Sequence, residues 1–171
     1  MSSPRSTPRR PRRSRSALSR EVQTAAQRAV DAASRFKTMM VVIQPSTGRI
    51  LAIAQNPLAD SDGPLATIGL YPPGSTFKMV TSAAAIGTGL AQPSTMVGCP
   101  GTVTIGPRTI PNYDQFALGT VPLQTAFARS CNTTFAKLAS EMGPSDLAAA
   151  AAKMGIGQHY DVPGVPVDSG S

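Results

Sequence analysis

The sequence predicts a mixed α/β fold in which a helix and a β-hairpin are followed by a buried helix and then by several further helices. Three patterns indicate this order. Small and apolar residues recur at helical spacing across residues 19–36. Two β-rich runs, 38–44 and 49–55, flank the turn sequence Pro-Ser-Thr-Gly. A third segment, which follows Pro73 and Gly74, is nearly free of charge and has a helical composition.

The first helix and the hairpin have recognisable ends. Ser19 can cap the helix, and Glu21 lies in its first turn, where the helix dipole favours an acid. The helix would bury a stripe made of Val22, Ala25, Ala26, Ala29, Val30 and Ala33. Gly48 supplies the turn of the hairpin. Both strands are apolar on both faces, which is typical of a sheet covered by helices.

The segment after Gly74 is predicted to be a buried helix that ends at Gly87 and Gly89. Its apolar side chains occupy more than one face, since Phe77, Val80, Thr81 and Ala84 fall on one side and Met79, Ala83 and Ile86 on another. Between residues 63 and 107 the only formally charged residue is Lys78. A charged side chain in such a segment is rarely buried without a function.

The rest of the chain is predicted to be mainly helical. Residues 102–114 indicate a short strand and then a loop, and residues 161–171 a loop. Three helices are expected between them, namely 120–130 with Thr120 as cap and Pro122 in the first turn, 132–143 ending at Gly143, and 145–157 with Ser145 as cap. The hairpin thus lacks partner strands, and two strands alone are not a stable sheet.

The positive charge of the chain is confined to its N-terminus. The formal net charge is +7, but residues 1–20 hold seven arginines and no acid, so the rest is balanced. We expect residues 1–18, rich in Arg, Pro and Ser, to be a disordered tail, and residues 19–171 to form the domain. The tail is compatible with an arm for nucleic acid or anionic membrane. Because such composition identifies no partner, we favour a solvated tail and expect no specific nucleic acid.

Other features exclude several classes of protein. No apolar run follows the twin arginines of the tail, and none is long enough to span a membrane, so neither a signal nor a transmembrane segment is recognised. Cys99 and Cys131 are too few for a disulfide scaffold and are expected to be buried free thiols. His159 has no second metal ligand at a suitable spacing, so we expect neither metal nor cofactor.

Ser75 and Lys78 form an S-x-x-K pair that can do chemistry. Residues three apart on a helix are neighbours, so a neutral lysine amine could take the serine's proton and create a nucleophile. Burial in an apolar segment lowers the pKa of a lysine and favours the neutral amine. The pattern is short, and the chain holds a second copy, Ser34 to Lys37, in an ordinary surface helix.

A second short motif, Ser130-Cys131-Asn132, lies 55 positions after Ser75, between two predicted helices. A second hydroxyl could relay a proton to a leaving nitrogen, and an amide could hold a substrate's peptide group. Serine and asparagine at such a junction are equally typical of helix caps. The S-x-x-K and S-x-N motifs together occur in serine β-lactamases and penicillin-binding proteins.

From these motifs the chain resembles the transpeptidase domain of penicillin-binding proteins. The sequence LYPPGSTFK, residues 70–78, is closer to the class B nucleophile motif than to the bifunctional one. The stretches EVQTAAQRAVDAA, VVIQPSTGRILAIAQNP and SCNTTFAKLA are similar to the opening helix, first hairpin and second motif of that domain. The resemblance covers roughly residues 19–160, in order, and implies the penicillin-binding/β-lactamase-like transpeptidase fold.

The resemblance implies a role for each motif residue. Ser75 would be the acylated nucleophile, Lys78 its general base, Ser130 the proton relay and Asn132 the ligand of the substrate amide. The reaction would be attack on the D-Ala-D-Ala bond of a peptidoglycan stem peptide, followed by acyl transfer to another stem. β-Lactams would acylate the same serine. The family is extracytoplasmic and is held at the bacterial membrane by an anchor that we do not recognise here.

The family's third motif, K-T-G, is not found in this sequence. None of Lys37, Lys78, Lys137 and Lys153 precedes Thr-Gly or Ser-Gly. In the family, that motif lies on a strand that lines the cleft and contributes an oxyanion-hole amide. We therefore expect the N-terminal half of a transpeptidase domain, without the C-terminal sheet strands, catalytically incompetent as a chain and poorly folded, with an exposed sheet edge.

Three alternatives stay open at this stage. Within the fold, the chain could be a β-lactam sensor or β-lactamase. It could instead be a pseudoenzyme without activity. From another class, it could be a non-enzymatic fragment or interaction protein that uses its basic arm.

Overall fold

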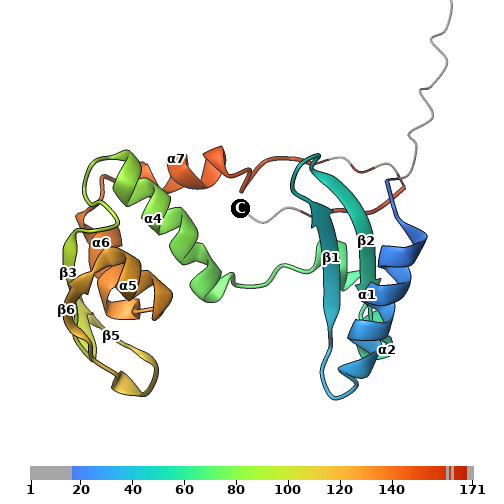
Figure 1. Ribbon diagram of the computed structural model, residues 1–171, viewed down its shortest axis with the longest axis horizontal. Coiled ribbons are helices and arrows are strands. Elements are labelled where there is room, and N and C mark those ends of the chain that lie inside the picture. The colour runs from blue at the N-terminus through green and yellow to red at the C-terminus, as the bar shows by residue number, and fades with distance from the viewer. Residues whose placement is uncertain (1–16, 161, 163, 169–171) are drawn as a thin grey trace, which may run out of the picture. The chain divides into compact units, whose positions relative to one another are not determined.

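The computed structural model describes residues 17–160, 162 and 164–168 (Figure 1). The predicted tail therefore lies almost entirely outside the described residues. The described chain forms two compact units. One contains the residues up to Gly69 and the described part of 160–168, and the other contains residues 70–159. No helix of the described residues has the length and apolar character needed to cross a bilayer.

The first unit is built on the predicted helix and hairpin. Its elements are α1 (Arg20–Ala32), β1 (Met39–Gln44), β2 (Arg49–Gln55), α2 (Pro57–Asp60) and α3 (Leu65–Ile68). The cap prediction is confirmed, because the backbone N–H of Val22 donates to Ser19 Oγ over 3.4 Å. The hairpin is also confirmed: β1 and β2 are antiparallel, and Gly48 closes the turn with a φ of 67°.

Two helices contact the hairpin, and part of strand β1 stays exposed. Helix α1 lies along the hairpin and forms a small core of Ala26, Val30, Ala52 and Ala54, with Val22 and Val42 at its edge (Figure 1). Among the described residues β1 and β2 pair only with each other. Met40, Val41 and Ile43 of β1 remain exposed. Helix α3 also contacts both strands, so the expected helical cover is present but leaves these β1 side chains exposed.

A buried asparagine ties the end of α1 to the end of the hairpin. Asn56 is 1% exposed, and its amide nitrogen donates to the carbonyls of Ala33 and Phe36. Its Oδ1 accepts the backbone N–H groups of Thr38 and Ala59. All of these contacts lie within the first unit.

The second unit combines helices with two short ladders. Its elements are η1 (Gly74–Phe77), α4 (Lys78–Gly87), β3 (Met96–Cys99), β4 (Thr102–Ile105), β5 (Arg108–Pro111), η2 (Tyr113–Gln115), β6 (Gly119–Pro122), α5 (Leu123–Ala128), α6 (Asn132–Glu141) and α7 (Asp146–Lys153). Strand β3 pairs with β6, and β4 pairs with β5. Ala85, Ala91, Leu123, Phe135 and Leu138 form the main core.

Several sequence predictions for this unit were wrong. Residues 102–114 form a hairpin, β4–β5, instead of one strand and a loop. Residues 120–122, expected to begin a helix, belong to strand β6, and the helix starts only at Leu123. The β3–β6 ladder overrides the helix signal of Pro122, because pairing with a distant strand is invisible to local patterns.

Helix α4 is buried on one side only. Val80, Thr81, Ala84 and Ala85 are buried, together with Lys78. Met79 and Ile86 are 55% and 39% exposed, so the expectation of burial all round does not hold for the described residues. Helices α6 and α7 both contact α4. Its first turn is the 3₁₀ segment η1, in which Ser75 lies.

Candidate active site

Ser75 and Lys78 meet at the start of α4. Gly74, with a φ of 55°, turns the chain from the two prolines into η1. Ser75 is exposed, whereas Lys78 is only 8% exposed. Lys78 Nζ lies 3.1 Å from Ser75 Oγ, the contact that the S-x-x-K spacing predicts.

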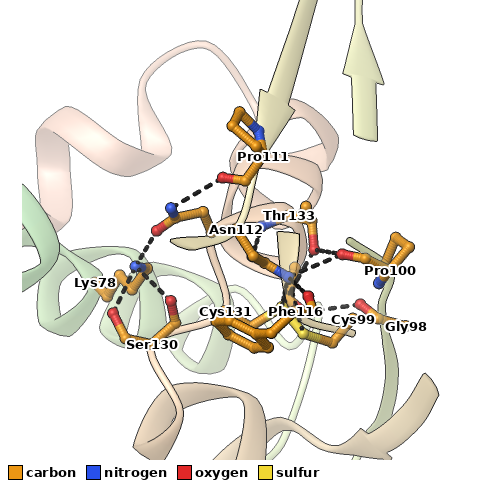
Figure 2. Close-up of a disulfide and its surroundings, with 12 residues drawn as sticks. Lys78, Gly98, Cys99, Pro100, Pro111, Asn112, Phe116, Ser130, Cys131 and Thr133 are labelled. Atoms are coloured by element: carbon orange, nitrogen blue, oxygen red, sulfur yellow. Dashed lines mark hydrogen bonds between the residues drawn. A yellow bond between two sulfur atoms is a disulfide. The ribbon is translucent and has the colours of Figure 1, made fainter. Parts of the chain in front are cut away.

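Ser130 reaches the same pair from the turn between α5 and α6. Its backbone is left-handed, with a φ of 55°, a conformation that is uncommon outside glycine. Its hydroxyl lies 2.9 Å from Lys78 Nζ and 3.0 Å from Ser75 Oγ, and its carbonyl oxygen lies 3.1 Å from Lys78 Nζ. Figure 2 shows Lys78 and Ser130 facing each other. The turn thus brings a second hydroxyl between amine and serine.

Asn132, the first residue of α6, completes the cluster. Its Oδ1 lies 2.6 Å from Lys78 Nζ, and its Nδ2 donates to the carbonyl of Pro111 over 3.1 Å. The structure therefore brings all four predicted residues into one hydrogen-bonded group. The second S-x-x-K copy is elsewhere, since Lys37 is exposed and forms an ion pair with Asp62.

The hydrogen bonds around Lys78 can be satisfied by an ammonium group or by a neutral amine. Four oxygens surround Nζ: Ser75 Oγ, both the hydroxyl and carbonyl oxygens of Ser130, and Asn132 Oδ1. A neutral amine has two protons and one lone pair. The two protons can go to the carbonyl of Ser130 and to Asn132 Oδ1, which only accept. The lone pair then remains to accept a proton from a hydroxyl.

Burial favours the neutral form of the Lys78 amine. Burial lowers the pKa of Lys78 below its ordinary value. The described ion pairs are Lys37 with Asp62 and Lys137 with Glu141, so no described carboxylate pairs with Lys78. The ring centre of Phe135 lies 6.0 Å from Nζ.

A cavity of about 460 Å³ opens beside Ser75, Lys78 and Asn132. It is lined by Gly74, Ser75, Phe77, Lys78, Thr81, Ile110 and Asn132. Ser75 and Asn132 therefore border the same space, and both can contact a molecule placed there. No described cluster of three or more His, Cys, Asp or Glu could hold a metal ion, and His159 is exposed.

A disulfide next to the site was not predicted. Cys99 and Cys131, expected to be free thiols, are joined, and both are fully buried (Figure 2). They lie 32 positions apart in sequence. The β3–β6 ladder places Cys99 beside the chain that leads into α5. The number of cysteines alone cannot show that two of them lie close together. The sequence hint was the position of Cys131 inside the Ser130-Cys131-Asn132 motif.

Comparison with known proteins adds to this geometry. Residues 38–168 match the penicillin binding protein transpeptidase domain. The chain belongs to the penicillin-binding protein transpeptidase family. The PbpA peptidoglycan D,D-transpeptidase of Mycolicibacterium smegmatis is 33% identical over 146 residues, which cover 68% of this chain and 30% of the relative.

Solved structures agree with this assignment. The D,D-transpeptidase domain of a peptidoglycan glycosyltransferase from Eggerthella lenta matches with a TM-score of 0.77 and 34% identity, covering 89% of this chain and 39% of the other. The imipenem acyl-enzyme of penicillin-binding protein A from Mycobacterium tuberculosis matches with a TM-score of 0.73 and 27% identity, covering 82% and 40%. The predicted class B resemblance and the transpeptidase fold are thus confirmed.

The family assignment applies to part of a domain. The chain spans about 30% of the length of the curated relative and about 40% of the solved chains that it matches. The activity and substrates of the whole relatives are therefore assigned to this chain only as a proposal.

Proposed function

We propose that this chain carries the acyl-serine part of a penicillin-binding D,D-transpeptidase site, with peptidoglycan stem peptides as substrates and β-lactams as inhibitors. The observation that supports this most strongly is the Lys78 amine, buried away from any described carboxylate and 3.1 Å from Ser75 Oγ. A general base for a serine must be neutral, and this surrounding favours a neutral amine. Acyl-enzyme structures of the M. tuberculosis relative with imipenem and penicillin G support the same chemistry.

In the first step Lys78 Nζ accepts the proton of Ser75. Ser75 Oγ then bonds to the carbonyl carbon of the penultimate D-Ala, or to that of the β-lactam ring. The negative charge on the carbonyl oxygen is stabilised by the N–H of Ser75 at the start of η1, and a full oxyanion hole requires a second donor. Collapse of this intermediate breaks the bond to the leaving nitrogen.

The leaving nitrogen needs a proton as its bond breaks. Ser130 supplies it, since its hydroxyl is within 3.0 Å of both Ser75 Oγ and Lys78 Nζ. Lys78 returns the abstracted proton to Ser130. Asn132, which borders the cavity, binds the substrate's peptide group. Deacylation by another stem's amine uses the same residues in reverse.

The 171-residue polypeptide by itself is proposed to be unreactive. None of its four lysines precedes Thr-Gly or Ser-Gly, so the sequence offers no K-T-G strand to supply the second oxyanion donor. Loss of one such donor lowers a rate by about 10²–10³. The site residues would then be in place but the transition state would be only partly stabilised.

Labelling with a fluorescent penicillin tests both parts of the proposal. We expect no stoichiometric labelling of the 171 residues alone. Joining them to a K-T-G segment from a relative should restore labelling, and Ser75→Ala in the joined protein should abolish it. Labelling that persists in Ser75→Ala would refute the assignment of the nucleophile. Stoichiometric labelling of the 171 residues alone would refute only the inactivity.

The disulfide supports an extracytoplasmic location for the domain. Disulfides form and persist in oxidising compartments and are rare in the cytosol of mesophiles. The Cys99–Cys131 bond is fully buried. A chain folded in the cytosol should contain two free thiols after denaturation, whereas one recovered from outside the cell should contain none.

A further inference from the structure

Helix α6, which carries Asn132, begins without a cap of its own. The N-cap residue is Cys131, and its side chain makes no capping hydrogen bond. Its sulfur is instead committed to the bond with Cys99. The first N–H groups of a helix have no partner within the helix, and a Ser, Thr, Asp or Asn at the N-cap normally supplies one. Helix α6 therefore needs an acceptor from elsewhere in the chain.

Asn112 supplies that acceptor from 21 positions upstream. Its Oδ1 accepts the backbone N–H of Thr133 over 3.1 Å (Figure 2). Thr133 is the second residue of α6, and its amide is one of the two that an N-cap side chain usually serves. Asn112 is 3% exposed, so this hydrogen bond does not compete with water.

The orientation of the Asn112 amide follows from its other contacts. Its Nδ2 donates to the carbonyl oxygens of Phe116, over 2.8 Å, and Pro100, over 2.9 Å. Since carbonyl oxygens only accept, the nitrogen must face them and Oδ1 must face Thr133. The two disulfide sulfurs lie 3.5 and 3.6 Å from the same nitrogen. Asn112 thus joins the Pro100 loop, the disulfide and helix α6.

Pro111, the residue before Asn112, also contacts the start of α6. The carbonyl of Pro111 accepts from Asn132 Nδ2 over 3.1 Å, which leaves Oδ1 of that amide directed at Lys78. Two consecutive residues at the end of β5 therefore hold the side chain of Asn132 and the backbone of Thr133. Ser130, in its left-handed conformation, lies two residues before Asn132.

We propose that Asn112 is a positioning residue of this site: it caps α6 in place of Cys131 and thereby holds Asn132 and Ser130 against Lys78. That these three residues perform catalysis rests on the function proposed above. The capping itself, and its effect on Lys78, can be measured without any acylation. A failure to label with penicillin therefore leaves the capping role of Asn112 intact. A failure of the capping tests likewise leaves the proposed acylation of Ser75 intact.

The first test uses the unaltered chain. A scalar coupling across the hydrogen bond, between the backbone nitrogen of Thr133 and the side-chain carbonyl carbon of Asn112, should be detectable by NMR. The Thr133 amide should also exchange slowly with deuterium although it lies in the first turn of a helix. Absence of the coupling together with fast exchange would overturn the proposal without any variant.

The second test compares two buried asparagines. Asn112→Ala removes the cap, and Asn56→Ala removes a similar four-contact amide in the first unit. Asn112→Ala should speed exchange at Thr133 by about fivefold or more, the usual effect of losing a cap. With Asn132 and Ser130 less firmly held, water reaches Lys78 and its pKa moves up toward the ordinary value. Asn56→Ala should change neither quantity.

The Lys78 titration separates positioning from general destabilisation. The chain has only four lysines, so the side-chain pKa can be followed with ¹³C-labelled lysine. An unchanged Lys78 pKa in a folded Asn112→Ala chain, or an equal shift in Asn56→Ala, would overturn the positioning role.

Discussion

Lys78 Nζ lies 2.6 Å from Asn132 Oδ1, closer than the 3.1 Å that separates it from Ser75 Oγ. The amine is thus held most closely by a helix that begins 54 positions later, and less closely by the serine three residues before it. The amide oxygen of Asn132 carries no net charge, so this hydrogen bond orients the lysine side chain but does not form an ion pair with it. The site thus combines the local pair Ser75 and Lys78 with a contact from Asn132, which is distant in sequence.

The buried amine should make the stability of the fold depend on pH. Since burial lowers the pKa of Lys78, the unfolded chain binds more protons between the folded pKa and the ordinary value of about 10.4. The free energy of unfolding should therefore rise with pH across that window. Lys78→Met should remove this rise, as measured by urea unfolding from neutral pH to pH ~10. Exposed Lys153→Met serves as control and should retain it; equal slopes in both variants would contradict the prediction.

The left-handed backbone of Ser130 predicts an unusual order of stability among variants at this position. Ser130→Gly and Ser130→Ala both lose the hydroxyl, but only glycine adopts a φ of 55° without a steric cost. The glycine variant should be more stable than the alanine variant by about 1 kcal/mol in denaturant unfolding. At Ser140, inside helix α6, the order should reverse by a similar amount. The same order at both positions would argue against a strained Ser130.

The Cys99–Cys131 disulfide should contribute strongly to stability. Its cysteines are 32 positions apart, and closing a loop of that length stabilises by about 3–4 kcal/mol in the chain-entropy account. The double variant Cys99→Ala/Cys131→Ala should lose that much in denaturant unfolding. Because both cysteines are fully buried, the native chain should resist mild reductants and be reduced only when it unfolds. Rapid appearance of free thiols in the native chain under a mild reductant would contradict this.

The exposed face of the hairpin predicts association. Ile43 is 55% exposed on β1, which pairs with no described strand other than β2. Unpaired, apolar strands promote edge-to-edge aggregation, and lysine on such a strand opposes it. Ile43→Lys should reduce light scattering at equal concentration with little loss of stability. Val42→Lys, which places a charge in the core beneath α1, should instead destabilise the first unit.

Local features were predictable because local rules govern them. The Ser19 cap, the turn at Gly48 and the approach of Ser75 to Lys78 each depend on residues within a few positions. The family resemblance rests on short contiguous motifs of the same kind. Strand β6 was misassigned because Pro122 suits the first turn of a helix and nothing nearby reveals that β3 is its partner.

The sequence by itself determined the order of the first elements, the chemical types present at the site and the family to which the chain belongs. Only the tertiary structure decided that Cys99 meets Cys131, that Asn112 serves Thr133, and that Asn132 reaches Lys78. The physical reason is distance along the chain. A hydrogen bond or disulfide between residues 21 to 54 positions apart depends on how the ladders and helices pack, and no periodicity in the sequence encodes that packing.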